Sequence, residues 1–252
     1  MRTGKVTMSA RRLLLLPFAW LYGGVLHLRH ALFDRGLLKS TRPAVPTIAI
    51  GNLALGGTGK TPMMELVLRC LADVKPLATL SRGYGRSGTD FHEVLRSDNA
   101  TTAGDEPLQV KRKFPDVRVF VGADRIASVQ AMVKLEPTLR AVVLDDAFQH
   151  RRLNAGLNIL LTTHQRPWHI DALIPAGRLR DVTSRAQAAQ VVVVTKCPEV
   201  PAAALQEGWR AELGLHAEQA LFFSGIDYSE PATMEGEPGR ISDPRGTNLL
   251  LF

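Results

Sequence analysis

The sequence has few cysteines, few aromatic residues and no apolar run long enough to cross a bilayer. Its two cysteines, Cys70 and Cys197, have the spacing of neither a metal site nor a disulfide framework. They suit a reducing compartment, and we expect both to be buried. No repeat of the solenoid type is present. The composition, with 45% hydrophobic and 22% charged residues, is that of an ordinary globular protein and excludes wholesale disorder.

The positive charge excess lies entirely at the start of the chain. The net charge is +7, and residues 1–42 hold eight Lys and Arg against one acid, Asp34. The rest of the chain is therefore electrically balanced, which argues against a nucleic-acid-binding protein and predicts no nucleic-acid partner. The excess instead indicates a basic N-terminal element.

This basic element has an apolar centre, Leu13–Leu28, with basic residues on both sides. Sixteen uncharged residues interrupted by Pro17 are too few for a normal spanning helix, and no signal-peptide cleavage site follows. Apolar residues recur at helical spacing from Pro17 on, with Trp20 and Tyr22 among them. The pattern predicts a helix in the interface of an anionic membrane; the alternative is a helix that only packs on the domain.

The stretch VPTIAIGNLALGGTGKTP, residues 45–62, is typical of a nucleotide phosphate loop. An apolar run over 47–51 predicts a strand, and the glycine-rich turn after it leads into a helix. Such a turn lets backbone N–H groups converge on phosphates at a helix N-terminus. We expect Lys60 to reach the β- and γ-phosphates and Thr61 to bind Mg²⁺. The predicted nucleotide-binding residues are Ala54, Leu55, Gly56, Gly57, Thr58, Gly59, Lys60 and Thr61, with Ala54 where the strict pattern has glycine.

Short β-branched runs alternate with helical stretches along the rest of the chain. Strands are predicted over 76–81, 117–121, 139–144, 157–161, 190–195, 220–223 and, at the C-terminus, 248–252. Helices are predicted from 60 to about 71 and from about 123 to 135, a linker over 40–46, and a loop over 87–102. The alternation predicts an α/β fold of the P-loop NTPase type, with a mostly parallel sheet covered by helices on both faces. Ligands of such sheets bind beyond the carboxyl ends of the strands.

Acidic residues follow two of these segments. Asp145 and Asp146 end an apolar strand, where a carboxylate can hold Mg²⁺ opposite Thr61; the alternative is a plain solvated strand end. Asp105 and Glu106 lie in a predicted loop, Gly104–Pro107, and a carboxylate there could accept a proton from an attacking hydroxyl. The same tetrapeptide is also ordinary turn chemistry.

Several arginines also lie after strand ends or near helix starts, where a guanidinium can neutralise a transferring phosphoryl group or bind an anionic acceptor. For each of them taken alone, an ordinary surface arginine is the better interpretation. The candidates are Arg82, Arg86, Arg125, Arg178 and Arg180, and Gln149 with His150 are further candidates for contacts to the acceptor.

Taken together, these segments resemble the tetraacyldisaccharide 4′-kinase family, the lipid A 4′-kinases of Gram-negative bacteria. The matching stretches are GNLALGGTGKTP (51–62), SRGYGR (81–86), GDEP (104–107), GADR (122–125), LDDAFQHRRL (144–153), IPAGRLRD (174–181) and VVVTKCP (192–198). They occur in the family's order, and residues 15–36 are similar to its membrane-contacting helix. The resemblance implies three parts: the basic helical segment 1–42, a kinase core over 43–200, and the start of a C-terminal α/β portion over 201–252.

The resemblance implies transfer of the ATP γ-phosphate to the 4′-hydroxyl of a lipid A disaccharide 1-phosphate precursor. ATP and Mg²⁺ would be the cofactors, and the site would lie at the cytoplasmic face of the inner membrane, with no protein partner implied. The catalytic positions would be Lys60, Asp105, Asp145 and Asp146, and the metal would lie with Thr61, Asp145 and Asp146. Acceptor or supporting positions would be Arg82, Tyr84, Glu106, Arg125, Gln149, His150, Arg178 and Arg180.

The chain departs from the family pattern in two places. Asp181 stands where the family usually has glutamate, which shortens that side chain by one methylene. Family members also continue past the position of Phe252, with a histidine that partners the aspartate matched by Asp105. The expectation at this point is a fragment that retains the ATP site and lacks part of the catalytic dyad.

Three other interpretations are open. A membrane-associated ATPase switch of the chromosome-partitioning type would need a lysine where this chain has Leu55. A GTPase would read guanine with a motif that begins Thr195-Lys196, but Pro198 stands where that motif needs aspartate. A third interpretation is a fragment that binds nucleotide without catalysis.

Overall fold

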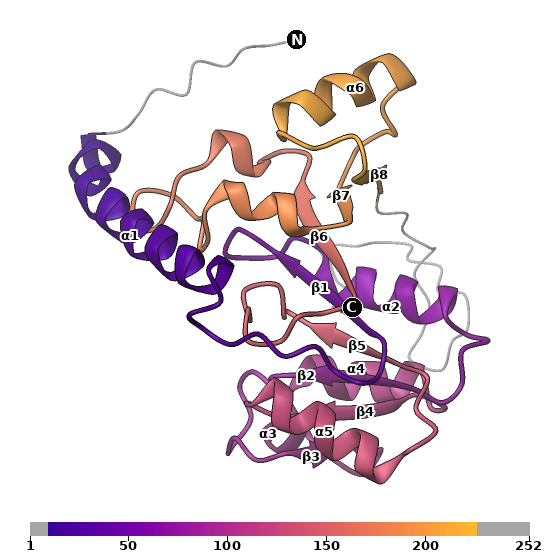
Figure 1. The fold of residues 1–252 in the computed structure, drawn as a ribbon. Coiled ribbons are helices and arrows are strands. Elements are labelled where there is room, and N and C mark those ends of the chain that lie inside the picture. Colours follow the sequence, from indigo (N-terminus) through magenta and orange to yellow (C-terminus); the bar gives the residue numbers. More distant parts are fainter. Residues whose placement is uncertain (1–9, 226–252) are drawn as a thin grey trace, which may run out of the picture.

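A computed structural model describes residues 10–225, and within them the chain folds around one eight-stranded sheet (Figure 1). The strand order is β3-β4-β2-β5-β1-β6-β7-β8, and every pairing is parallel except that of β3 with β4. The strands are β1 (Thr47–Asn52), β2 (Leu77–Ser81), β3 (His92–Glu93), β4 (Arg118–Val121), β5 (Ala141–Asp145), β6 (Leu157–Thr163), β7 (Val191–Thr195) and β8 (Ala220–Phe223). The predicted α/β class and mostly parallel sheet are confirmed.

Helices pack on both faces of this sheet (Figure 1). The helices are α1 (Ala10–Asp34), α2 (Lys60–Cys70), α3 (Ala100–Ala103), α4 (Asp105–Lys113), α5 (Arg125–Leu135) and α6 (Ala203–Glu212), with short 3₁₀ turns at Trp168–Ile170 and Thr183–Ala188. One hydrophobic core packs α2 and α4 against one face, and another packs α5 against the opposite face. Val143 of β5 belongs to the first core and its neighbour Leu144 to the second, because successive residues of a strand point to opposite faces.

The sheet topology brings the nucleotide loop and the acidic pair together. β1 is central and pairs with β5 on one side and with β6 on the other. Ile50 of β1 lies opposite Asp145 in register, so the phosphate loop after β1 and the pair Asp145-Asp146 emerge at the same edge. This edge, at the carboxyl ends of the parallel strands, is where α/β sheets bind ligands.

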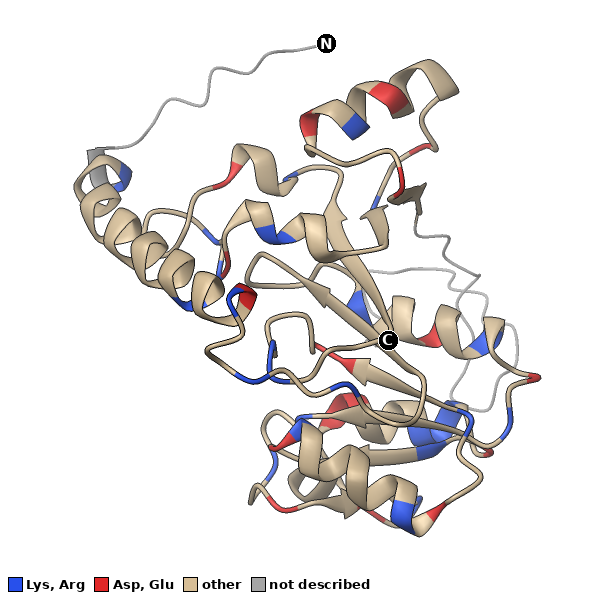
Figure 2. Cartoon of the chain, viewed as in Figure 1, with Lys and Arg blue, Asp and Glu red and all other residues tan. Residues whose placement is uncertain are grey.

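Helix α1 starts before Pro17 and runs through it, although the helical pattern in the sequence begins at that residue. A proline removes one backbone hydrogen bond, and the apolar residues on both sides continue the helix. Several of its large apolar side chains are exposed, Leu14, Trp20 and Leu21 among them. Figure 2 shows that the body of α1 carries little charge between its two ends. Within the described residues, no helix has the length and apolar character needed to span a bilayer.

The structure corrects three local expectations. The segment 87–102 is not all loop: β3 pairs with β4, and α3 is capped by Asn99 and Thr102. These elements are too short to show a periodic pattern. Residues 105–107 form the first turn of α4, not a loop. Cys70 is exposed at the end of α2, because it points away from the core; only Cys197 is buried.

The predicted division into three parts stays a prediction. β8 adds to the same sheet as β7, so the described residues on both sides of position 200 share one sheet. The predicted strand over 248–252 and the basic residues of positions 1–9 lie outside the described residues.

Candidate active site

The glycine-rich loop between β1 and α2 has the backbone shape of a phosphate cradle. Gly56 has a φ of 100° and Gly59 a φ of 87°, in the left-handed region that favours glycine. Gly59 caps α2 without a side-chain hydrogen bond to the first turn, so the helix begins at Lys60 with its N-terminus open to a ligand. An anion there meets backbone N–H groups and the positive end of the helix dipole. The loop therefore fits a phosphate chain.

Neighbouring side chains fix the backbone of this loop. Asn52 Nδ2 donates to Ala54 O at 2.7 Å, and Thr195 Oγ1 donates to Thr58 O at 2.7 Å. The Arg178 guanidinium donates to Leu55 O. Three strand ends and loops thus hold the cradle in one shape, which lowers the cost of ordering it around a ligand.

All eight predicted nucleotide-binding residues line one cavity of about 910 Å³. Its far wall contains Thr195, Lys196, Ser224 and Gly225 at the ends of β7 and β8. Met63 and Leu66 of α2 add an apolar surface. The volume is in the range of small-molecule and cofactor sites.

A second cavity of about 600 Å³ adjoins the first. Most of the predicted acceptor residues line it: Arg82, Tyr84, Glu106, Arg125, Gln149, His150 and Arg180. The two cavities share Lys60, Tyr84, Glu106, Asp146 and Arg180. A ligand in the first cavity would therefore meet a ligand in the second beside Lys60 and Asp146.

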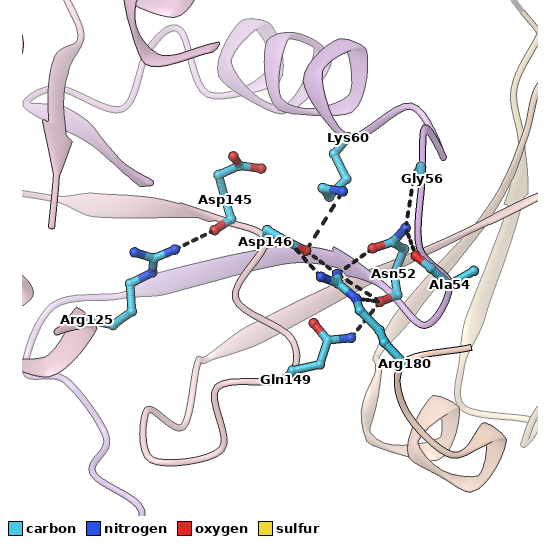
Figure 3. A network of polar contacts seen from close by, with 9 residues as sticks. All are labelled: Asn52, Ala54, Gly56, Lys60, Arg125, Asp145, Asp146, Gln149 and Arg180. Atoms are coloured by element: carbon cyan, nitrogen blue, oxygen red, sulfur yellow. Dashed lines mark hydrogen bonds and ion pairs between the residues drawn. The ribbon is translucent and has the colours of Figure 1, made fainter. Parts of the chain in front are cut away.

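A polar network lies at this junction (Figure 3). The Arg180 guanidinium donates to both carboxylate oxygens of Asp146, with Nη1 2.9 Å from Oδ2. Arg180 Nη2 also donates to Asn52 Oδ1 at 2.6 Å. Lys60 Nζ lies 3.9 Å from Asp146 Oδ1. Asp146 has a φ of 46°, a conformation that costs a non-glycine residue about 1 kcal/mol or more and is concentrated at functional sites.

The two adjacent aspartates have opposite electrostatic environments. Burial raises the pKa of Asp145 to about 6, and the negative charges of Asp146 and Glu106 add to this shift. Burial acts in the same direction on Asp146, but the hydrogen bonds and charge of Arg180, with Lys60, outweigh it and hold the pKa of Asp146 below its usual value. Titratable groups whose environments separate their pKa values are typical of active sites.

The second cavity offers buried positive charge to an anion. Arg125 is only 4% exposed, and its guanidinium donates to the carbonyl oxygens of Gly122 and Asp145. Its Nε is buried and has no hydrogen-bond partner in the described structure. Burial lowers the pKa of His150, so this imidazole is neutral at pH 7. The desolvated positive charge of Arg125 beside the cavity favours a phosphate or another oxyanion there.

The oxygen donors beside the phosphate loop fit Mg²⁺, and two of them, Thr61 and Asp146, line the first cavity. Thr61 and Asp145 line one small cavity between α2 and β5. Among residues 10–225, no group of three or more His, Cys, Asp or Glu side chains is arranged to hold a metal ion. Mg²⁺ in kinases is bound by one or two carboxylates together with substrate phosphates, so Thr61 with Asp145 and Asp146 suffices for it.

Two predicted residues lie apart from these cavities. Arg178 contacts the back of the phosphate loop and lines neither large cavity. Asp105 is exposed in the first turn of α4 and also lines neither of them, whereas its neighbour Glu106 lines both. A Cβ built on Gly104, which has a φ of 88°, would lie 3.1 Å from Tyr84 O. The glycine thus lets α4 approach the strand end and places Glu106 at the junction.

Sequence reasoning missed Asn52, which contacts the loop backbone and Arg180. Its place at the end of the strand that leads into the loop is the signal that could have identified it. The sequence places Thr195 at a strand end and both Thr195 and Lys196 in a family stretch and an incomplete guanine-reading motif, with no contact to the phosphate loop predicted. Thr195 instead binds the phosphate loop, and Lys196 lines the first cavity.

Comparisons with known proteins agree with this geometry. A crystal structure described as the "apo" form of LpxK from Aquifex aeolicus in complex with ATP superposes with a TM-score of 0.66 at 29% identity. The match covers 90% of this chain and 86% of that one.

Curated relatives are closer in sequence. The tetraacyldisaccharide 4′-kinase of Flavobacterium johnsoniae is 44% identical over 97% of this chain and 72% of its own length. The enzyme of the same name from Bacteroides fragilis is 45% identical over 85% of this chain, which spans 57% of that relative. A family model described as tetraacyldisaccharide-1-P 4′-kinase matches residues 11–230. The chain therefore belongs to the tetraacyldisaccharide 1-phosphate 4′-kinase family.

Proposed function

We propose that this chain is a lipid kinase that transfers the γ-phosphate of ATP to the 4′-hydroxyl of a tetraacyldisaccharide 1-phosphate in lipid A biosynthesis. The observation that carries the proposal is the junction of two cavities at Lys60, Asp146 and Arg180. One cavity is lined by a phosphate loop and the other by cationic residues, of which Arg125 is buried, Arg180 is half-buried and Arg82 is exposed. The names of the relatives and the ATP in the related crystal structure support the two ligands.

In this proposal the loop and Lys60 hold the nucleotide phosphates. Thr61, Asp145 and Asp146 would hold Mg²⁺, which when bound would neutralise charge on the phosphoryl group. Arg180 is fixed by Asp146 and Asn52 at the junction, where it can stabilise negative charge that develops during transfer. Asp105 stays the general base that the family resemblance implies, although in this structure it lines neither cavity and its neighbour Glu106 lines both.

The acceptor is proposed to lie in the second cavity. Its phosphate is an anion, and Arg82 and Arg125 provide guanidinium groups on that wall. Arg125 lines that wall with a largely desolvated positive charge, which favours a ligand with oxyanion character. Gln149 donates to Asn52 O at 2.6 Å and so is held at the wall of the second cavity.

The acyl chains of such an acceptor stay in a membrane, and α1 provides a surface for it. The helix exposes Leu14, Phe18 and Leu21 to solvent and has basic residues at its ends. An apolar face with flanking cations favours the interface of an anionic bilayer. We therefore propose peripheral binding at the cytoplasmic face of the inner membrane, where ATP is available.

The test is transfer of the γ-phosphate from labelled ATP to a tetraacyldisaccharide 1-phosphate in mixed micelles with Mg²⁺. We expect product with the unchanged chain and none with Lys60→Met. Lipid-independent ATP hydrolysis would indicate an ATPase switch, and a preference for GTP would indicate a GTPase. ATP binding without transfer would show the non-catalytic alternative to be right. The family match does not favour the ATPase switch, the GTPase or the non-catalytic alternative.

A further inference from the structure

Helix α1 is hydrogen-bonded to residues 178–182, the segment that carries Arg180. His30 Nε2 lies 2.6 Å from Asp181 Oδ1, and both side chains are buried, with the residues 5% and 1% exposed. Eight residues earlier on the same helix, the Tyr22 hydroxyl donates to Arg180 O at 2.9 Å. The helix therefore holds two consecutive residues of the segment from behind.

The side chain of Arg180 extends from this segment to the site. Its guanidinium donates hydrogen bonds to Asp146 and Asn52 at the junction of the two cavities (Figure 3). Its backbone N–H donates to Leu53 O at 2.8 Å. Arg180 thus faces the site while Asp181 faces α1, so a shift of the backbone at Asp181 moves the guanidinium relative to Asp146.

The loop that follows Asp146 rests on the same helix. Arg151 Nη1 donates to His30 O at 3.0 Å, and Arg151 Nη2 donates to Asp34 Oδ1 at 2.6 Å. The Arg151 guanidinium also lies over the Phe33 ring, 5.0 Å from its centroid. The two loops that meet at the Asp146–Arg180 pair are therefore both supported by one turn of α1.

The pair of His30 and Asp181 is costly to break. Asp181 Oδ1 also accepts a hydrogen bond from Val182 N at 2.9 Å, so the oxygen that contacts His30 has a backbone partner as well. Removal of the imidazole would leave a buried carboxylate without its side-chain partner, and such a group is strongly unfavourable. The least costly response is a movement of the segment that lets Asp181 reach water, and Arg180 would move with it.

We propose that His30 is a positioning residue of the phosphoryl-transfer site. Through Asp181 it fixes the backbone at Arg180, and thereby the geometry in which Arg180 grips Asp146 beside Lys60. Helix α1 is then a structural part of the site as well as a membrane-contacting surface. This inference rests on the proposed function, because it takes Arg180 and Asp146 to act in phosphoryl transfer.

The test compares His30→Ala with His27→Ala, a matched change at an exposed histidine on the same helix. The measurements are kcat and KM in the micelle assay and binding to vesicles of phosphatidylethanolamine and phosphatidylglycerol. We expect His30→Ala to lower kcat by about 10- to 100-fold, the range that small misplacements of catalytic groups produce. Vesicle binding and KM for the lipid should stay within about twofold of the unchanged chain, and His27→Ala should match it throughout.

A double-variant cycle asks whether His30 acts through Asp181. If it does, the double variant His30→Ala/Asp181→Ala has about the same kcat as the worse single variant, because both changes break one contact. If the double variant instead loses kcat by the product of the two single-variant factors, the inference is overturned. Loss of vesicle binding with an unchanged kcat would also overturn it, because α1 would then serve the membrane alone.

Amide hydrogen exchange of residues 178–182 provides a readout that does not depend on turnover. We expect faster exchange there in His30→Ala than in His27→Ala, with the exchange of β5 and β6 unchanged, which also shows that the variant is folded. Equal exchange in both variants would overturn the inference. If the unchanged chain transfers no phosphate, the proposed function fails, and the exchange comparison still decides whether His30 positions the Arg180 segment.

Discussion

Asp146 and Arg180 form a two-point contact at the place where the two cavities meet. The guanidinium satisfies both oxygens of the carboxylate and, through Nη2, also the side chain of Asn52. A planar donor with several N–H groups is needed to serve all three acceptors at once. The contact thus joins the end of β1, the end of β5 and the segment before Val182 in one rigid arrangement.

A conservative change at Arg180 should therefore be severe. A lysine keeps the charge, but its single ammonium group cannot bind Asp146 at two points and Asn52 as well. We expect Arg180→Lys to lower kcat by about 100-fold or more, as the loss of a preorganised donor does in other enzymes. The measurement is the initial rate of phosphate transfer at saturating ATP. Arg140→Lys, at an exposed arginine, is the control, and an equal loss there would show that the effect is not specific to the site.

Neutralising the two aspartates should change the stability of the metal-free protein in opposite directions. The pKa of Asp145 rises to about 6 in the folded state from a model-peptide value of 3.8. Between these two pH values the folded state binds more protons than the unfolded state, so stability falls as the pH rises. At pH 7 Asp145→Asn removes this cost and should stabilise the protein by about 1–3 kcal/mol, or several degrees in Tm.

The pH dependence provides the check on this prediction. Below pH 3.8 the carboxyl group is protonated in both states, so Asp145→Asn should leave Tm almost unchanged there. Asp146→Asn is the contrasting variant, because Arg180 and Lys60 hold the pKa of Asp146 below its usual value. Its ionised form stabilises the fold, and Asp146→Asn should lower Tm at pH 7. Calorimetry without Mg²⁺ or nucleotide decides, and a lower Tm for Asp145→Asn at pH 7 would contradict the argument.

Much of the site could be predicted because its signals are local. The β-run, the glycine turn and Lys60 with Thr61 lie within one short stretch, and the apolar run before Asp145 identifies a second strand end. Parallel strands bring such ends to one edge of the sheet, so the fold class alone predicts that the phosphate loop and Asp145 lie close together. The eight predicted nucleotide-binding residues line one cavity, and their role in binding stays a prediction.

The parts that could not be predicted depend on contacts between distant segments. His30 and Asp181 are separated by 151 positions, and nothing in either neighbourhood indicates the other. Asn52 reads as the last residue of a strand until its contact with Arg180 is seen. Which of Asp105 and Glu106 lines the cavities depends on how α4 packs, and the sequence pattern does not show which of two adjacent acids does so.

Gly104 should tolerate no side chain. An alanine there would have to adopt a φ of 88°, with its Cβ 3.1 Å from Tyr84 O. We expect Gly104→Ala to destabilise the protein by about 1–3 kcal/mol and to lower phosphate transfer, because α4 and Glu106 would move away from the junction. The matched control is Gly208→Ala in α6, where a Cβ meets nothing within 4 Å. That change should be neutral or stabilising by about 0.5–1 kcal/mol, since alanine favours a helix interior. Urea unfolding measures both, and equal effects would contradict the prediction.

A charge on the apolar face of α1 should separate membrane binding from folding. Leu21 is 71% exposed on that helix, so Leu21→Glu removes little packing in the folded protein and should leave Tm unchanged within about 2 °C. The variant can no longer bury the Leu21 side chain in the bilayer, and anionic lipids repel the new carboxylate. Vesicle binding should therefore fall about tenfold or more. Leu205→Glu in α6 makes the same change at a residue that is 58% exposed and should bind vesicles normally. Flotation with phosphatidylglycerol vesicles measures both variants. Equal binding by both would mean that the membrane meets the protein through a surface other than α1.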